Sequence, residues 1–195
     1  PQLRLRVLEA SSGFLREWLQ SGRLDLAILY GDKPESGLAK RALLDEELVL
    51  VTSAQAARLP KKVTLDKLAR WPLVLPSREH GLRRIIDEAC APLGLQLEVV
   101  AEIDSLPSVK GAAEEGIGGT ILPLGAVAQE IAAGKLQASK IDSPGMTRRV
   151  VCATSVTRPA TLASTAVTAL AQEVIHRMVL SQAWPGRWVG SKNGD

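Results

Sequence analysis

The stretch LRLRVLEASSGFLREWLQSGRLDLAILY, from Leu3 to Tyr30, decides the fold class. Apolar residues alternate with arginine over its start, Leu3 to Leu8, which predicts a β-strand. The small residues Ser11 to Gly13 then offer an N-cap for a helix from Phe14 to Gln20. The nearly continuous apolar run Leu24 to Tyr30 is typical of parallel strands that are buried on both faces. The chain therefore opens as β-α-β.

The same alternation continues along the rest of the chain. Two apolar runs, Leu38 to Leu44 and Leu48 to Thr52, predict two separate strands on either side of the acidic triplet Asp45 to Glu47. From Ala183 onward no period remains, so we expect a loose tail. The other predicted elements are a short helix that Thr64 caps, strands at 73–75, 97–103, 120–122, 136–141 and 148–154, and helices that start near Leu82, Ser105, Leu124 and Thr161.

Strands that alternate with helices indicate an α/β fold with mixed, mainly parallel sheets. Breaks at Trp71-Pro72 and near Ser143 to Gly145 divide these sheets between two Rossmann-like lobes. Lobe I then comprises residues 1–71 and 147–195, and lobe II comprises residues 72–146. Because the chain leaves lobe I once and returns once, we expect a cleft between lobes that two crossover strands join, which is a common setting for small ligands.

The composition argues against a nucleic-acid footprint in this chain. Its 24 basic and 21 acidic side chains give a formal charge of +3 and are interspersed, and aromatic residues make up only 3%. A DNA-binding face would cluster lysine and arginine, so we expect no specific DNA binding by the chain alone. No apolar run approaches the ~18 residues of a membrane helix, and the start lacks a secretory signal, so we expect a cytoplasmic location.

Signals for catalysis, metals and cofactors are thin. Cys90 and Cys152 lie in apolar patterns without a C-x-x-C motif, which predicts reduced core residues. The glycine-rich run Gly116 to Gly119 follows a helix and precedes a strand, the reverse of a dinucleotide fingerprint, and therefore predicts a helix C-cap and a tight turn. His176 lies late in the last helix. We expect no catalytic residue, no metal site and no cofactor.

The turn Ser77 to Gly81 is the first candidate binding element. It places a hydroxyl at Ser77, a guanidinium at Arg78 and an imidazole at His80 just before the helix that starts at Leu82. Helix N-termini present free N–H donors and a partial positive charge, so these groups could receive a carboxylate or a phosphate. The alternative interpretation is an ordinary capped turn, and the residues alone leave both open.

Two more turns occupy equivalent places between a strand and a helix. Ser11 and Ser12 form one of them, and Asp104 and Ser105 form the other. An N-cap role explains each pair fully. Ligands of open α/β sheets, however, bind outside the carboxyl ends of the strands, so these turns could also converge on a shared ligand.

Five segments in order resemble the effector-binding domain of LysR-type transcription regulators. They are GRLDLAILYG at 22–31, LLDEELVLVTS at 43–53, PLVLPSREHGLRRIID at 72–87, EIDSLPSVKGAAEEGIGGTILP at 102–123 and RPATLASTAVTAL at 158–170. They cover most of the chain. The form PSREHGLR at 76–83 is also similar to the branch that includes nitrogen-control and cyanate- or cyanuric-acid-responsive regulators.

The resemblance implies a two-lobed fold similar to type 2 periplasmic binding proteins, with a small inducer in the interlobe cleft. It implies dimeric or tetrameric assembly on promoter DNA through a winged helix-turn-helix domain. Family members carry that domain, a linker helix, and a further strand and helix before the segment equivalent to Pro1, so we expect this chain to be a piece of a longer regulator. By this comparison the ligand positions are Ser11, Ser12, Tyr30, Ser77, Arg78, His80, Gly81, Asp104 and Ser105.

The sequence also leaves two other functions open. A solute-binding protein of a transporter has the same architecture, and a secretory signal upstream would favour it. An enzyme on this fold would need more titratable groups in the cleft than the sequence offers. The resemblance, together with apolar Phe14, Trp18 and the long helix after Thr161, predicts self-association.

Overall fold

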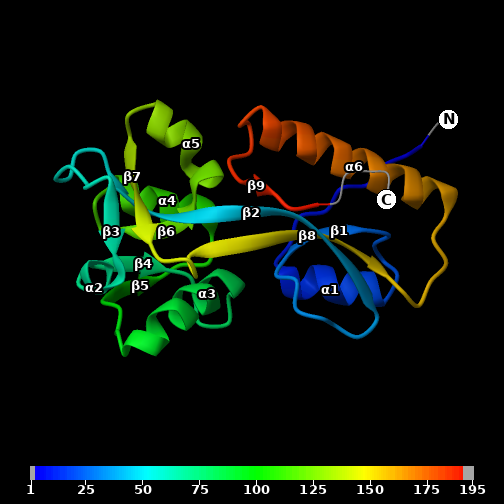
Figure 1. The fold of residues 1–195 in the computed structure, drawn as a ribbon, viewed down its shortest axis with the longest axis horizontal. Helices are drawn as coiled ribbons and strands as arrows, with labels where there is room; N and C mark the ends of the chain where they lie inside the picture. The colour runs from blue at the N-terminus through cyan, green and yellow to red at the C-terminus, as the bar shows by residue number, and fades with distance from the viewer. Residues whose placement is uncertain (1–2, 191–195) are drawn as a thin grey trace. The chain divides into compact units, whose positions relative to one another are not determined.

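A computed structural model describes residues 3–190 of the chain (Figure 1). The chain divides into two compact units. Unit 1 comprises the residues up to Asp45 and from Arg149 onward, and unit 2 comprises Glu46–Arg148. The sequence breaks put the first boundary at Trp71-Pro72 instead. The structure groups residues 46–71 with unit 2 because the strand Lys62–Thr64 pairs with Leu136–Asp142 of that unit.

In unit 1, strands β1 and β8 pair antiparallel, with Tyr30 opposite Val150, so the parallel arrangement expected for Leu24 to Tyr30 is wrong at this edge. The helices α1 and α6 lie on opposite sides of these strands (Figure 1). Leu29, Val151 and Leu44 are fully buried between them. The elements are α1 (Ser12–Gln20), β1 (Ala27–Tyr30), the first part of β2 (Leu38–Ser53), nearly all of β8 (Thr147–Ser155), α6 (Leu162–Leu180) and β9 (Arg187–Trp188).

In unit 2, the second part of β2 pairs antiparallel with β6 and β7, β3 runs parallel to β7, and β4 runs parallel to β5. The α/β class with mixed sheets is confirmed, but the expectation that the sheets are mainly parallel is wrong, because antiparallel pairings predominate among those described. The elements are β3 (Lys62–Thr64), α2 (Leu65–Leu68), β4 (Leu73–Leu75), α3 (Gly81–Cys90), the 3-10 helix η1 (Ala91–Leu93), β5 (Val99–Glu102), α4 (Leu106–Glu114), β6 (Thr120–Pro123), α5 (Leu124–Ala132) and β7 (Leu136–Asp142).

Several local signals are confirmed. The hydroxyl of Thr161 accepts the backbone N–H of Ser164, and the Ser164 hydroxyl accepts the N–H of Thr161, which makes a reciprocal capping box at the start of α6. Gly116, just after α4, has a φ of 73°, as a helix C-cap requires. Both cysteines are buried and free, as expected for core residues.

The predicted strand Leu3 to Leu8 is wrong. The segment is not a strand, and within residues 3–190 no strand pairs with it. Its apolar side chains are open to solvent, with Leu5 68% and Val7 89% exposed. An alternating pattern becomes a strand only where a partner satisfies its backbone groups and covers its apolar face.

The acidic triplet does not separate two strands, because β2 runs unbroken through it. Each acid has a basic partner from another strand. Asp45 pairs with Arg149 and Glu46 with Arg148, both from β8, and Glu47 pairs with Lys140 of β7 at 2.7 Å. The pairing compensates charges that would otherwise interrupt a buried strand. β2 therefore passes from unit 1 into unit 2 at Asp45-Glu46 as a single extended segment.

The expectation of a loose tail from Ala183 is also wrong up to Gly190. Residues 187–188 form β9, which pairs antiparallel with Leu44 and Asp45 of β2. Trp184 and Trp188 pack against the cluster that contains Leu43, Leu44 and Val150. The sequence shows no period here because two tryptophans and a two-residue strand are too short to produce one.

Glu46, the buried acid of the triplet, should contribute far more to the free energy of unfolding than its exposed neighbour Glu47. Glu46 is 3% exposed and lies 2.6 Å from Arg148, whereas both side chains of the Glu47–Lys140 pair are more than half exposed. We expect Glu46→Gln to lower the free energy of unfolding by about 3 kcal/mol, because one partner of a buried pair remains uncompensated. The matched control Glu47→Gln should lower it by less than about 0.5 kcal/mol. Urea unfolding at neutral pH measures both, and equal effects would contradict this account.

Candidate functional site

The turn between β4 and α3 is closed by its own hydrogen bonds. The backbone N–H of His80 donates to the carbonyl of Ser77 at 3.0 Å. The Nδ1 atom of His80 accepts the backbone N–H of Leu82 at 3.2 Å, so the imidazole is the side-chain cap of α3. One of the free donors at the helix N-terminus is therefore already occupied by the ring.

Arg83 of α3 binds the backbone at the start of this turn. Its side chain is buried, and one guanidinium nitrogen donates to the carbonyl of Pro76 at 3.1 Å and to the carboxylate of Glu102 at 3.0 Å. Its Nε donates to Asp87 one helical turn later, at 3.0 Å. Sequence analysis treated Arg83 only as a residue of the helix. No sequence signal marks this role, because Arg83 lies on α3 and its partner Glu102 lies on the strand β5.

Asp104 joins the turn from the end of β5. Its carboxylate accepts the backbone N–H of Ser77 at 2.9 Å, and this bond is the main reason that the pKa of Asp104 lies below its usual value. Ser105 is the N-cap residue of α4, but its hydroxyl accepts from Ser108 and not from the helix backbone. The structure thus brings the Ser77 to Gly81 turn and the Asp104 turn together within unit 2.

His80 is held in its neutral form. Burial is the main reason that its pKa is lowered, and the nearby cations Arg148 and Arg84 lower the pKa further, while Asp104 opposes the shift. Protonation of Nδ1 would also remove the acceptor for Leu82.

Arg148 is a residue of the site that sequence analysis missed. It lies on β8, far along the chain from the turn, yet it acts electrostatically on His80. It also forms a largely buried ion pair with Glu46, in which its Nε and Nη2 atoms lie 2.7 and 2.6 Å from one carboxylate oxygen. The basic pair Arg148-Arg149 at the start of an apolar strand was the only available signal.

The remaining predicted positions all belong to unit 1. Ser11 is the N-cap residue of α1 and Ser12 is its first residue, and the Ser11 hydroxyl makes no capping hydrogen bond. Tyr30 ends β1, is 37% exposed, and its carbonyl accepts from Arg16 of α1 at 3.2 Å. The nine predicted residues form two groups, one in each unit.

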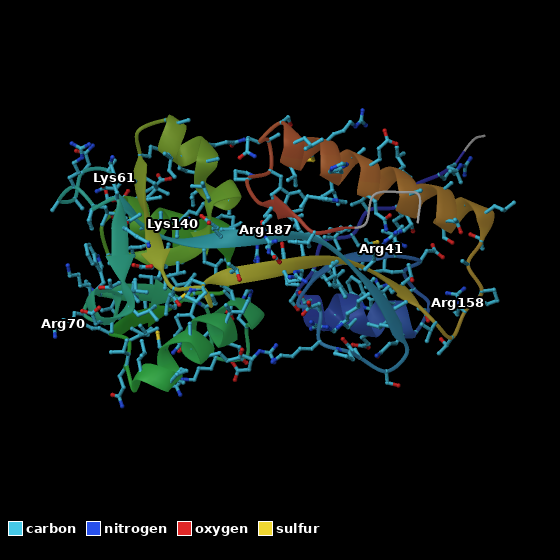
Figure 2. All side chains as sticks on the ribbon, viewed as in Figure 1. Arg41, Lys61, Arg70, Lys140, Arg158 and Arg187 are labelled. Atoms are coloured by element: carbon cyan, nitrogen blue, oxygen red, sulfur yellow. The ribbon has the colours of Figure 1, made fainter. Side chains whose placement is uncertain are left out.

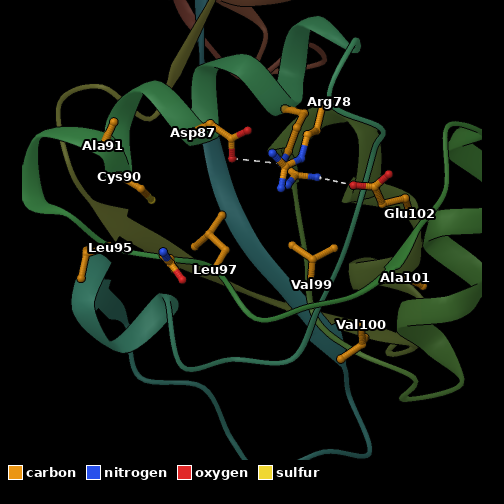
Figure 3. A pocket seen from close by; sticks show the side chains of 12 residues that line it. Arg78, Asp87, Cys90, Ala91, Leu95, Leu97, Val99, Val100, Ala101 and Glu102 are labelled. Atoms are coloured by element: carbon orange, nitrogen blue, oxygen red, sulfur yellow. Dashed lines mark hydrogen bonds and ion pairs between the residues drawn. The ribbon is translucent and has the colours of Figure 1, made fainter.

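A separate open pocket of about 880 Å³ lies along α3, η1 and β5. Figure 3 shows Asp87 of α3 and Glu102 at the end of β5 joined by dashed lines to an arginine between them, with Leu97 and Val99 lower in the view. Of the predicted site residues only Arg78 lines this pocket. Its two acids, Asp87 and Glu102, both pair with Arg83.

Among residues 3–190, no group of three or more histidine, cysteine, aspartate or glutamate side chains is placed to hold a metal ion. In the same part of the chain, no helix is both long and apolar enough to span a bilayer. Burial raises the pKa of the thiols of Cys90 and Cys152.

The geometry and the sequence agree with one family. The LysR substrate binding domain model matches residues 1–176. The chain belongs to this family. It is 38% identical over 159 residues to the HTH-type transcriptional regulator BbuR of Bordetella bronchiseptica, which is 81% of this chain and 48% of that protein. It is 31% identical over 146 residues to the nitrogen assimilation regulatory protein nac of Escherichia coli, which is 75% of this chain and 47% of that protein. The chain spans about half the length of these curated relatives.

Solved structures of this LysR family share the fold. The effector binding domain of QuiR in complex with shikimate matches with a TM-score of 0.75 at 20% identity, over 86% of this chain and 79% of that chain. The regulatory domain of CcmR from Synechocystis PCC6803 in complex with 2-PG matches with a TM-score of 0.76 at 20% identity, over 86% and 81%. The predicted similarity to type 2 periplasmic binding proteins is confirmed at the level of the fold.

The cap made by His80 should make stability depend on pH. Because the pKa of His80 is lowered in the folded protein, the unfolded chain binds more protons just below its reference pKa of about 6.5. Stability from this group is therefore present above that pH and is lost as the pH falls through it. We expect His80→Ala to cost about 1 kcal/mol at pH 7.5, the usual cost of a lost cap.

Urea unfolding at pH 7.5 and pH 5.5 measures this effect. His80→Asn is the matched control, because asparagine caps a helix without titrating. We expect the wild type to lose more stability between the two pH values than His80→Asn does. An equal loss in both proteins would show that His80 does not carry the pH dependence.

Proposed function

We propose that this LysR-family chain is the inducer-sensing part of a transcription regulator and binds a small polar or anionic effector with residues of both lobes. The observation that carries the proposal is the assembled turn of unit 2, where Ser77, His80 and Asp104 meet at the start of α3. The relatives with which the chain shares most of its length are transcription regulators. Two domains of the same fold were solved with the small molecules shikimate and 2-PG.

The charges of the turn favour a particular kind of effector. Arg78 is exposed at the turn and can attract an acidic group of the effector. Asp104 stays ionised and has already taken the N–H of Ser77, so it repels a bare anion but accepts a hydroxyl or an amine. An effector with both an acidic group and a hydrogen-bond donor therefore fits better than phosphate or sulfate alone.

The second group of predicted residues would complete the site from unit 1. Ser11 and Ser12 offer hydroxyls and backbone N–H groups at the start of α1, and Tyr30 offers an exposed phenol at the end of β1. In the proposed arrangement, the effector lies in the cleft between the lobes, and its binding changes the geometry of an attached DNA-binding dimer. We further propose that the chain is not an enzyme and that it acts in the cytoplasm. Promoter DNA would be bound by a region equivalent to the half of the relatives' length that this chain does not match.

A binding experiment tests the proposed effector site. We expect calorimetry on a panel of shikimate, small hydroxy acids, phosphate, sulfate and cyanurate-like ring acids to show binding by at least one hydroxy or ring acid. Ser12→Ala and Arg78→Ala should each weaken that binding by about ten- to a hundredfold, the cost of one charge-assisted hydrogen bond. The control Arg70→Ala removes an exposed arginine of unit 2 (Figure 2) and should leave the affinity unchanged. Equal affinity in all four proteins would place the site elsewhere.

Self-association is a second property of the proposed regulator. The helix α6 presents Leu162 and Leu170, 93% and 55% exposed, and α1 presents Phe14, 58% exposed and stacked on Trp18. Large apolar side chains that a helix exposes to solvent to this extent fit a protein–protein interface. We expect sedimentation velocity to show a dimer at micromolar concentration and Leu170→Lys to shift it towards the monomer. A strict monomer at high micromolar concentration would contradict the proposal.

A further inference from the structure

The tail from Trp184 to Gly190 is attached to β2 by backbone pairing. In β9, Trp188 lies opposite Leu44 and Arg187 lies opposite Asp45. Beyond β9, the backbone N–H groups of Val189 and Gly190 both donate to the carbonyl of Leu43, at 2.8 and 3.0 Å. The tail therefore covers the last residues of β2 before that strand enters unit 2 at Glu46. We call residues 184–190 the strap.

The strap is fitted closely to the strand that it covers. A Cβ atom at Gly186 would lie 2.9 Å from the carbonyl oxygen of Asp45 and 2.6 Å from the side chain of Leu44. Only glycine allows this approach without a shift of the backbone. The Trp188 ring also packs at a tilt against His176 of α6, with ring centroids 4.5 Å apart.

The strap also binds the carboxylate of Asp45, through which β2 pairs with β8. Arg187 of the strap donates to Asp45 at 2.7 Å, and Arg149 of β8 donates to both oxygens of the same carboxylate. Arg149 donates in addition to Asp32, just after β1, at 2.9 Å. Figure 2 shows Arg187 beside β2. One acid at the boundary of unit 1 thus connects the tail with both strands that pass between the units.

Two features indicate that the strap can detach. The indole N–H of Trp188 is buried but has no hydrogen-bond partner within residues 3–190, so the seated strap leaves one donor unsatisfied. The side chain of Arg187 is 77% exposed, so its ion pair with Asp45 is screened by solvent.

We propose that the strap is a conformational device that controls how freely β2 and β8 flex where the chain passes between its two units. When the strap is seated, Leu43 to Asp45 are paired, and Asp45 is held between Arg149 and Arg187. When it detaches, β2 loses this edge partner and Asp45 loses one of its two cations. The proposal does not depend on the identity of any effector.

Hydrogen exchange on the full chain tests the first step. Gly186→Ala adds the Cβ that meets Asp45, and Gly111→Ala is the matched control, because a Cβ at that position in α4 meets nothing within 4 Å. We expect Gly186→Ala, and a chain that ends at Ala183, to speed exchange at residues 43–45 by at least about fivefold, as expected for the loss of a backbone pairing. The strands β4 and β6 of unit 2 should exchange as in the wild type.

Pulsed electron paramagnetic resonance tests the second step, the effect of the strap on how freely the two units move. Spin labels are attached at Lys135→Cys in unit 2 and Glu173→Cys in unit 1, where the native side chains are 62% and 60% exposed. A chain without these two substitutions, treated with the same label, shows whether the buried native cysteines react. We expect a broader distance distribution in the chain that ends at Ala183 and no change with Gly111→Ala. An unchanged distribution in the shortened chain, or faster exchange throughout unit 1, would overturn the proposal.

Discussion

The ion pairs between β2 and β8 are the interaction on which the rest of the structure depends. Asp45 and Glu46 are neighbours on one strand, and their partners Arg149 and Arg148 are neighbours on the other. The boundary between the two units passes between Asp45 and Glu46 on β2 and between Arg148 and Arg149 on β8. Because both acids are compensated, β2 can cross that boundary as one strand of 16 residues without leaving a charge unpaired in the interior.

The same pairing places charge at the candidate site. Arg148 is fixed by Glu46, and from there it helps to keep His80 neutral, so the ring can cap α3 as an acceptor. Arg149 is fixed by Asp45 and also pairs with Asp32 beside the end of β1. The charged groups beside His80 and just after β1 are therefore held from two consecutive positions on β8. A change at this point of the chain would alter the site as well as the fold.

Sequence patterns predicted the elements that are set by local chemistry. The N-cap of α6 at Thr161, the C-cap at Gly116 and the buried run of β6 follow from nearby residues and were correct. The errors concern partners distant in sequence. The predicted strand Leu3 to Leu8 has no pairing strand within residues 3–190, and β2 continues through its acids because bases 90 and more positions away reach them. For the site, the turns could be predicted, whereas Arg148 and the bond from Ser77 to Asp104 required the fold.

The central claim is that the start of α1 and the turn before α3 bind one effector together. Amide chemical shifts in a nuclear magnetic resonance titration, with the hydroxy or ring acid that calorimetry identifies, test this claim most directly. The account predicts that Ser11 and Ser12 shift together with Ser77, His80 and Gly81, with a single dissociation constant for both groups. Shifts confined to the pocket beside α3, at Cys90, Gln96 and Val100, would contradict it.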